Sequence, residues 1–443
     1  MRVLVLVLLF ASEARSQVPS YELHLNEALS KAKNRSDQLK SVKSDILASQ
    51  EQSDASYTSL LPELTLDGNL HYVSTVPTIQ IAPGTPAFAL GTHLNYSIGP
   101  TLSYTVWDGG ASRDLHKSQE KTTEARKQDE RTQTAQVLSS VRLAYIRTQL
   151  GLEQLRFLSD SLKLSKSQAQ DISNRHKEGT SSTLDLLTAK KEVLSYELLF
   201  KQRQTDLSSA LRDLVALVEQ KPSLEIKEPT PKGFTNSGLW LILDPLEDTL
   251  KSENASEPAE LSETPPQVLS QELFADSLEL LAKSQKSALY PRLQISGRTS
   301  LDYPNGPIPE RINQNTLAVG FSMPIYEFSK VQHLAAQKTY EAEAARHRKN
   351  QIASDMQRDF AKSKETLRSL RQQDKDAREV LNQAEKLAKM YYEAYRLGRI
   401  TLIEVQASNL RTLQAKVDLS QIQAFILNHL TILKTLAIKD ETL

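Results

Sequence analysis

Two acidic residues occupy matching positions in the two halves of this 443-residue chain. Asp185 stands six residues after Gly179, and Glu404 stands six residues after Gly398. A carboxylate in the first turn of a helix stabilises that helix, because the helix dipole favours negative charge there. If symmetry brought several such carboxylates together, they would repel one another, raise each other's pKa and attract cations. The sequence leaves both interpretations open.

Catalytic chemistry has few candidates elsewhere in the chain. There is no Cys, which excludes disulfides, thiolate nucleophiles and Cys-ligated metals. The eight His residues are scattered, and none belongs to an HExxH motif or another paired ligand motif. No GxSxG, P-loop or GxGxxG pattern occurs. We therefore expect no enzyme activity, no catalytic residue, no bound metal and no cofactor.

The charge balance and the N-terminal residues limit the classes of protein to which this chain can belong. Lys plus Arg and Asp plus Glu number 54 each, so the chain has no basic surface excess and we expect no nucleic-acid partner. Arg2, an apolar run at 3–11 and the small-x-small residues at 14–16 predict a secretory signal peptide over 1–16. That run is far shorter than the roughly 20 residues of a membrane-spanning helix.

Three landmarks occur twice in the same order, which indicates a duplicated structural unit. The segment 60–68 returns as 289–297, the segment 106–108 returns as 325–327, and the two glycine turns follow. We predict a signal peptide at 1–16, repeat 1 at 17–219, a linker at 220–266, repeat 2 at 267–436 and a tail at 437–443. In repeat 1 we expect an entry helix at 25–58, a β-hairpin at 64–106, a long helix at 110–176 and a returning helix at 184–219. In repeat 2 we expect the same four elements at 267–289, 293–326, 329–396 and 402–434.

Four segments alternate apolar and polar residues over about ten positions, the length of a tilted transmembrane strand. They cover 64–73, 95–106, 293–303 and 316–325. Read alone, each also fits a soluble sandwich with one face in water, but four in a secreted chain favour a membrane barrel. About eight strands is the usual minimum for a barrel, so several chains must contribute strands.

The long helices carry two heptad patterns each. Residues 110–176 contain no Pro and one internal Gly, Gly151, and at 1.5 Å per residue they make a helix of about 100 Å. One register of this helix includes Val141 and Leu155, and another includes Leu143 and Phe157. Two apolar seams require a neighbour on each side, as in a closed ring of helices.

The linker differs from the repeats in composition. It is rich in Pro, Ser and acidic residues, and only 238–243 has the apolar run of a structured segment. We expect it to pack outside the helices.

The doubled order of these elements resembles the TolC-like outer-membrane efflux proteins. The pattern of apolar residues and alanines over 23–32 is similar to that family's entry helix, and the two glycine turns followed by Asp185-Leu186 and Glu404-Val405 resemble its most recognisable motif. The likeness covers nearly the whole mature chain. Two positions depart from the family: Ile400 stands where an Arg is frequent, and Ala407 stands where a second acid can occur.

The resemblance implies a mainly α fold with transmembrane β-hairpins and two structural repeats per chain. Three chains form a 12-stranded β-barrel in the outer membrane, continued by a long α-helical barrel into the periplasm. The function implied is the channel-tunnel of a tripartite efflux or type I secretion system, a passive exit duct gated at its periplasmic end. The partners implied are a homotrimer, a periplasmic adaptor (membrane fusion) protein, an inner-membrane pump and outer-membrane lipid.

In that setting the turn region becomes the candidate gate. Threefold symmetry would repeat each acid as a ring at the periplasmic mouth, and hydrogen bonds among Tyr395, Asp185 and Arg399 can hold the mouth closed. The gate candidates are therefore Asp185, Glu404, Tyr395 and Arg399, with Gly179 and Gly398 as the helix-turn glycines.

The alternative function is a secreted trimeric coiled-coil adhesin or stalk with a β-barrel anchor. A stalk would have one long helix per repeat and no returning helix, which the turns at Gly179 and Gly398 argue against. A periplasmic adaptor would need a lipoyl-like or barrel-like β-domain between its helices, and the sequence offers none.

Charge should be rejected on the lipid-facing side of the strands and accepted on the other. Replacing Leu102 or Phe321 by Arg should cost about 2–4 kcal/mol of stability in the membrane, because a charge near mid-bilayer is poorly solvated. Replacing Ser103 or Ser322 by Arg should cost much less. Insertion into the outer membrane, measured by fractionation, checks this, and equal effects for the two pairs would contradict the assignment of faces.

Overall fold

The computed structural model describes residues 20–80, 82–84, 86–219, 234–236 and 239–438. The signal peptide expected at 1–16 lies outside the described residues, as do 220–233 of the linker and most of the expected tail. The chain divides into two units. We call residues 40–132 and 264–355 the sheet unit, and residues 1–39, 133–263 and 356–443 the turn unit.

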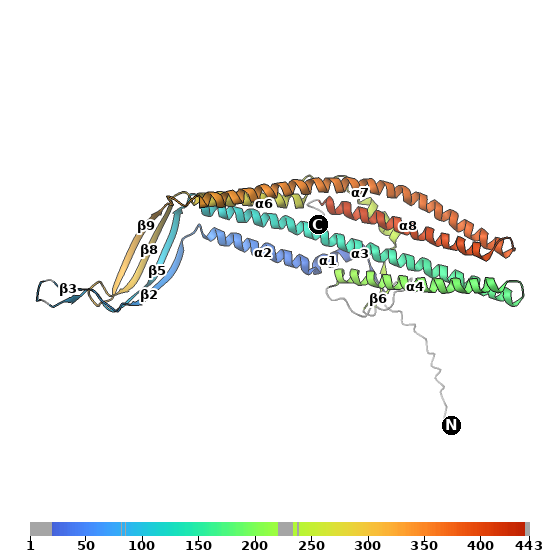
Figure 1. The fold of residues 1–443 in the computed structure, drawn as a ribbon, viewed down its shortest axis with the longest axis horizontal. Coiled ribbons are helices and arrows are strands. Elements are labelled where there is room, and N and C mark those ends of the chain that lie inside the picture. Colours follow the sequence, from blue (N-terminus) through green and yellow to red (C-terminus); the bar gives the residue numbers. More distant parts are fainter. Residues whose placement is uncertain (1–19, 81, 85, 220–233, 237–238, 439–443) are drawn as a thin grey trace, which may run out of the picture. The chain divides into compact units, whose positions relative to one another are not determined.

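One antiparallel sheet of four strands organises the sheet unit (Figure 1). Its order is β2-β5-β8-β9, so two hairpins join through β5 and β8. The strands are β2 (Glu63–Tyr72), β5 (Leu94–Trp107), β8 (Arg292–Tyr303) and β9 (Ile312–Ser322). Two short strands, β3 (Thr78–Ile79) and β4 (Phe88–Ala89), pair inside the first hairpin loop. Among the described residues, β2 and β9 each have a strand partner on one side only.

The apolar face of this sheet is the exposed one. Leu64 on β2 is 71% exposed and Leu317 on β9 is 80% exposed. On β5 the exposed Leu102 lies between Thr101 and Ser103, which are half-buried. A soluble sandwich would bury the leucines, so this arrangement fits a sheet whose apolar face meets lipid.

The last strand differs from its predicted extent. The sequence indicated a strand over 316–325, whereas β9 begins at Ile312 and ends at Ser322. Pro324 has no backbone N–H to donate to a ladder, which explains why pairing stops before it. The alternation at Met323 and Ile325 therefore continues beyond the strand.

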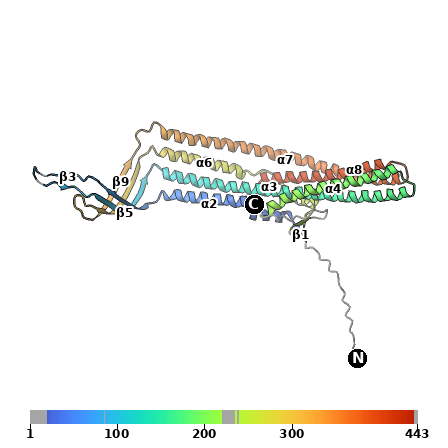
Figure 2. The ribbon, with the colours of Figure 1, turned by 60° about the horizontal axis from the view of Figure 1, so that its bottom comes forward.

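Four helical segments lie side by side in the sheet unit (Figures 1 and 2). They are α2 (Asp37–Thr58), the first part of α3 (Ala111–Lys177), α6 (Pro266–Ser287) and the first part of α7 (Lys330–Arg396). Small hydroxyl residues join three of them, α2, α3 and α6: Ser49 Oγ lies 2.8 Å from Thr123 Oγ1, and Ser118 Oγ donates to the Ser277 carbonyl at 2.7 Å. These short side chains let the helix backbones approach closely.

The predicted entry helix over 25–58 is two helices. α1 (Leu25–Arg35) ends at Ser36, whose φ of −56° and ψ of 117° leave the helical region. The Ser36 hydroxyl then accepts a hydrogen bond from the Leu39 N–H at 3.3 Å. Ser competes with helical hydrogen bonds through its own side chain, so it suits a helix boundary better than an interior.

The turn unit holds α1, α4 (Thr183–Val218), α5 (Leu246–Ala255), α8 (Leu402–Leu436) and the later parts of α3 and α7. The first predicted seam of α3 is its buried face, with Val141, Thr148 and Leu155 fully buried. In the second seam Leu143 and Leu164 are exposed, so one chain covers that seam only in part.

The linker contains more structure than expected. Strand β7 (Leu239–Leu243) pairs antiparallel with β6 (Phe234–Asn236) and parallel with β1 (Ser20–Leu23). Helix α5 follows and was not predicted. A parallel pairing between segments so far apart leaves no local pattern in the sequence.

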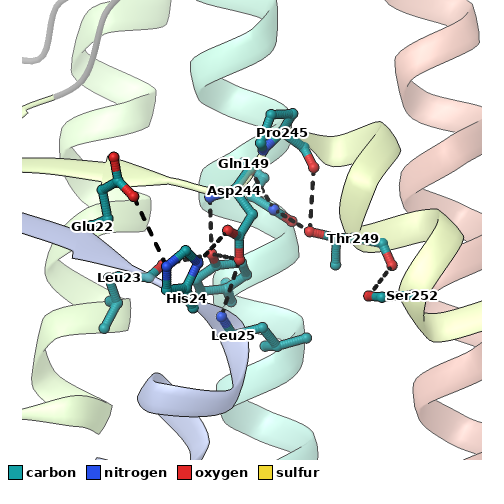
Figure 3. A network of polar contacts seen from close by, with 10 residues as sticks. Glu22, Leu23, His24, Leu25, Gln149, Asp244, Pro245, Thr249 and Ser252 are labelled. Carbon is teal, nitrogen blue, oxygen red and sulfur yellow. Dashed lines mark hydrogen bonds and ion pairs between the residues drawn. The ribbon is translucent and has the colours of Figure 1, made fainter.

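One carboxylate joins three parts of the turn unit (Figure 3). Asp244 Oδ2 accepts from the Leu25 N–H at 3.2 Å and lies 2.9 Å from the hydroxyl of the buried Tyr145. Asp244 Oδ1 lies 2.6 Å from His24 Nδ1, and the hydrogen bond and charge of Asp244 raise the pKa of the His24 imidazole. Gln149 Nε2 donates to the Asp244 carbonyl at 2.7 Å. Asp244 and its hydrogen-bond partners thus connect the start of α1, the middle of α3 and the chain after β7.

Replacing Asp244 by Ala should weaken this junction. The Leu25 N–H at the start of α1 would lose its acceptor, because His24 supplies no side-chain cap. We expect a loss of about 1–3 kcal/mol in unfolding free energy, the range for a charged hydrogen-bonded group. Thermal unfolding of the purified protein measures it, and Asp248→Ala on the exposed face of α5 is the matched control. Equal unfolding temperatures for the two variants would contradict the role of Asp244.

Candidate functional site

Two helical hairpins of the turn unit end in turns of the same geometry. Gly179, between α3 and α4, has φ of 75°, and Gly398, between α7 and α8, has φ of 70°. The Thr180 N–H donates to the Arg175 carbonyl at 2.8 Å, and the Arg399 N–H donates to the Ala394 carbonyl at 3.0 Å. This is the Schellman arrangement, which needs a left-handed residue that Gly adopts without strain.

The two predicted acids begin the returning helices, but their carboxylates differ in surroundings. Glu404 forms a capping box: its Oε2 accepts from the Thr401 N–H at 2.7 Å and from the Thr401 hydroxyl at 2.9 Å. These hydrogen bonds hold the pKa of Glu404 below its usual value. In α4 the cap is the Ser182 hydroxyl, which accepts from the Asp185 N–H at 3.0 Å. The Asp185 carboxylate instead lies 3.5 Å from Ser181 Oγ.

Tyr395, at the end of α7, packs among residues of the first repeat. Its neighbours include Ile172 on α3 and Ala189 on α4, both buried. Burial raises the pKa of the Tyr395 phenol; a hydrogen bond from Ser181 opposes that rise, and the nearby Asp185 carboxylate adds to it. The structure therefore brings together two of the predicted residues, Tyr395 and Asp185, with Ser181 between them.

Arg399 takes no part in that group. Its side chain is exposed, and within the described part of the chain it makes no hydrogen bond or ion pair with Tyr395 or Asp185. Its backbone N–H instead completes the turn. Among the described residues no hydrogen bond joins any two of Tyr395, Asp185 and Arg399; Tyr395 and Asp185 each meet Ser181 instead.

Sequence reasoning missed a second polar contact between the same hairpins. The Tyr392 hydroxyl donates to Asp171 Oδ2 at 3.2 Å, and the Arg175 Nε lies 3.2 Å from the same oxygen. Burial and the charge of Asp171 raise the pKa of the Tyr392 phenol. Asp171 and Arg175 stand four residues apart, which signals an ion pair on one helix face, but nothing local links them to Tyr392.

Two amide side chains extend the contact along the returning helices. Gln406 Nε2 on α8 donates to the Thr188 carbonyl at 3.3 Å, and Asn409 Nδ2 donates to Gln168 Oε1 at 3.1 Å. All of these bonds run between the first and second repeats. The two turns are therefore held together over several helical turns.

The described residues contain no group of three or more His, Asp or Glu side chains arranged to hold a metal ion. No helix in the described part of the chain is both long and apolar enough to cross a membrane.

Comparison with known proteins decides the family. The family model described as outer membrane efflux protein matches residues 28–219 and 258–437. The chain belongs to the outer membrane efflux protein family. No curated protein sequence matches this chain.

Solved structures share the fold at low sequence identity. The CmeC outer membrane channel of Campylobacter jejuni is 15% identical with a TM-score of 0.76, covering 93% of this chain and 84% of CmeC. The outer membrane protein VceC of Vibrio cholerae is 14% identical with a TM-score of 0.75, covering 93% of this chain and 96% of VceC. The open-state MtrE outer membrane channel of Neisseria gonorrhoeae is 13% identical with a TM-score of 0.70, covering 93% of this chain and 88% of MtrE.

The family and the fold establish several of the expectations. This outer membrane efflux protein has a repeated family domain and the fold of trimeric channels in which a β-barrel continues into a long α-helical barrel. It is an outer-membrane efflux channel-tunnel of the tripartite kind, lying in the outer membrane and extending into the periplasm. Its family and fold are those of channel proteins rather than enzymes.

The capping box makes the start of α8 sensitive to acid. Because the folded pKa of Glu404 is lowered, its contribution to stability is present above the usual value of 4.5 and is lost as pH falls through the lowered pKa. We expect the advantage of the wild type over Glu404→Gln in thermal unfolding temperature to hold at pH 7 and to shrink below about pH 4.5. Glu393→Gln, on the exposed face of α7, is the control. A difference between wild type and Glu404→Gln that does not change with pH would contradict the role of the charge.

Proposed function

We propose that a homotrimer of this chain is a passive exit duct, fed by an inner-membrane pump through a periplasmic adaptor and closed at rest by its helix turns. The observation that supports this is the set of hydrogen bonds between the α3–α4 and α7–α8 hairpins near both turns. Cargo can pass a ring of such hairpins only when the hairpins separate. These contacts are the ones that separation would break.

The strongest candidate contact is the Tyr392 hydroxyl on Asp171. A hydrogen bond to a charged group contributes roughly 1.5–3 kcal/mol, about twice the value for a neutral pair. Arg175 pairs with Asp171 and orients it, so the acceptor is in place when α7 approaches. Tyr395 adds apolar contact with Ile172 and a polar contact with Ser181.

The two acids have different proposed roles. Asp185 lies beside Tyr395 and belongs to the closing contact. Glu404 is held by Thr401 in its own helix, so it closes nothing within one chain. Repeated three times around the mouth, its exposed carboxylate attracts cations, and the exposed Arg399 is free to face another copy.

Three features support the trimer. The sheet has two strand edges without a partner among the described residues. Its apolar face is exposed, and the second seam of α3 is half uncovered. Copies that pair their edges into twelve strands would complete the strand ladders, present the apolar face to lipid and place a neighbouring chain beside the open seam.

The stalk alternative is not favoured. It has one long helix per repeat, whereas α4 and α8 return along α3 and α7 over 36 and 35 residues. A duct needs such returning helices to complete its wall.

Removing the Tyr392 hydroxyl should open the resting channel. We expect Tyr392→Phe and Asp171→Asn to raise the conductance or the open fraction of single trimers in planar bilayers, because each removes the same hydrogen bond. The adjacent Tyr391→Phe removes a hydroxyl that has no hydrogen-bond partner in the described part of the chain, and it should leave conductance unchanged.

The predicted gate residues are tested in the same bilayers. Asp185→Ala and Tyr395→Ala should also weaken closure, and Glu404→Ala should lower cation preference without opening the mouth. If all of these variants conduct like the wild type, with the same selectivity, the turn residues only start and end helices.

A further inference from the structure

A cavity of about 520 Å³ lies within the turn unit, apart from the helix turns. Helix α3, the C-terminal end of α8 and the segment 256–260 after α5 surround it. Its volume is in the range of small-molecule sites, which is about 300–1,000 Å³. Most of its wall is apolar, from Ala135, Leu138, Pro258, Ala259, Ala437 and Ile438.

One cation lines this apolar cavity without a partner. Arg142 follows Ala135 and Leu138 on the same face of α3. Its Nε is buried and has no hydrogen-bond partner, and no ion pair to its guanidinium is found among the described residues. Burial lowers the pKa of Arg142, and the charge of Glu253 opposes that shift.

The acids nearby are already engaged. Glu253 forms a largely buried ion pair with Lys434 at 2.6 Å, and Glu257 forms an ion pair with Arg371 at 2.7 Å. Glu260 also lines the cavity but is exposed to solvent. Arg142 is therefore the lining cation that has no ion-pair partner among the described residues, and the charge of Glu253 reaches it only from a distance.

We propose that this cavity binds a small amphiphile with one carboxylate, whose head group pairs with Arg142 and whose apolar tail packs against Leu138 and Ala437. An Arg side chain stays protonated at any working pH, so burial of its charge has to be compensated by an anion. A carboxylate matches the guanidinium with two parallel hydrogen bonds. The apolar walls offer nothing to a polar tail but gain from covering an alkyl chain.

Such a ligand would also contact three separate parts of the turn unit at once. Arg142 belongs to α3, Ala437 follows the last turn of α8, and Pro258 belongs to the linker. A molecule touching all three should raise the thermal unfolding temperature of the protein. This effect does not depend on the state of the helix turns, so the proposal stands apart from the gate.

Calorimetric titration with octanoate tests the proposal. The full-length trimer should be held in lipid nanodiscs without detergent, since detergents are amphiphiles, and empty nanodiscs give the background. We expect saturable binding of one octanoate per chain, and binding roughly tenfold weaker or more in Arg142→Met, because a charge-assisted pair is lost. Arg147→Met is the matched control, since Arg147 lies on α3 but is exposed and pairs with Asp213.

Further arms separate the head group from the tail. Acetate and octanol should each bind at least tenfold more weakly than octanoate, since acetate lacks the alkyl tail and octanol lacks the carboxylate. Leu138→Trp should fill the cavity and weaken octanoate binding while Arg142 remains. Binding of octanoate that is equal in wild type and Arg142→Met, acetate as good as octanoate, or no saturable binding to the wild type would each overturn the proposal.

Discussion

The sheet of one chain cannot satisfy its own backbone in a membrane, and the rest of the structure follows from that constraint. Lipid offers no hydrogen bonds, so every strand edge at membrane depth must pair with another strand. β2 and β9 lack a second partner among the described residues, and their leucines point outward. Closure by further copies supplies both the missing ladders and a lipid-facing surface. In a threefold assembly, each residue of the chain then occurs three times around the axis.

The two repeats remain similar in the backbone of their turns but differ in side-chain contacts. Both turns keep a left-handed glycine and the same pair of backbone bonds, because the hairpin has to reverse in the same way. Their acids have diverged: Glu404 is held by its own helix start, whereas Asp185 lies beside a tyrosine of the other repeat. The turn geometry is therefore common to both repeats, and the contact between the hairpins is where they differ.

Elements with a strong period were predictable and contacts between distant segments were not. The alternation at 64–73 and 95–106 located β2 and β5, and the Pro-free stretches located α3 and α7 to within a residue or two. Ser36 was missed because one serine is a weak signal inside a helical pattern. The pairing of β1 with β7 was missed because parallel strands carry no turn between them.

The candidate site shows the same limit at the level of side chains. Tyr395 and Asp185 were found because they lie near recognisable glycines, and the structure does bring them together. Arg399 has the same proximity in sequence, but its side chain is exposed. Asp171 and Tyr392 meet only because α3 and α7 lie at a particular rotation. The rotation of α3 about its axis depends on which helix packs against each of its two apolar seams. The sequence shows the two seams but not which helix covers each one.

The energy of the proposed gate is small per chain and substantial per trimer. One charged hydrogen bond of roughly 1.5–3 kcal/mol, repeated three times, gives about 5–9 kcal/mol against opening. At that cost the resting mouth would be open for less than about one part in a thousand of the time, since each 1.4 kcal/mol is a factor of ten. A partner shifts this balance only by its preference for the open over the closed form, so reversing 5–9 kcal/mol needs a preference of about 10⁴- to 10⁶-fold. A gate built from single hydrogen bonds such as Tyr392 to Asp171 is therefore tight without a partner and opens for a partner whose contacts form only with the separated hairpins.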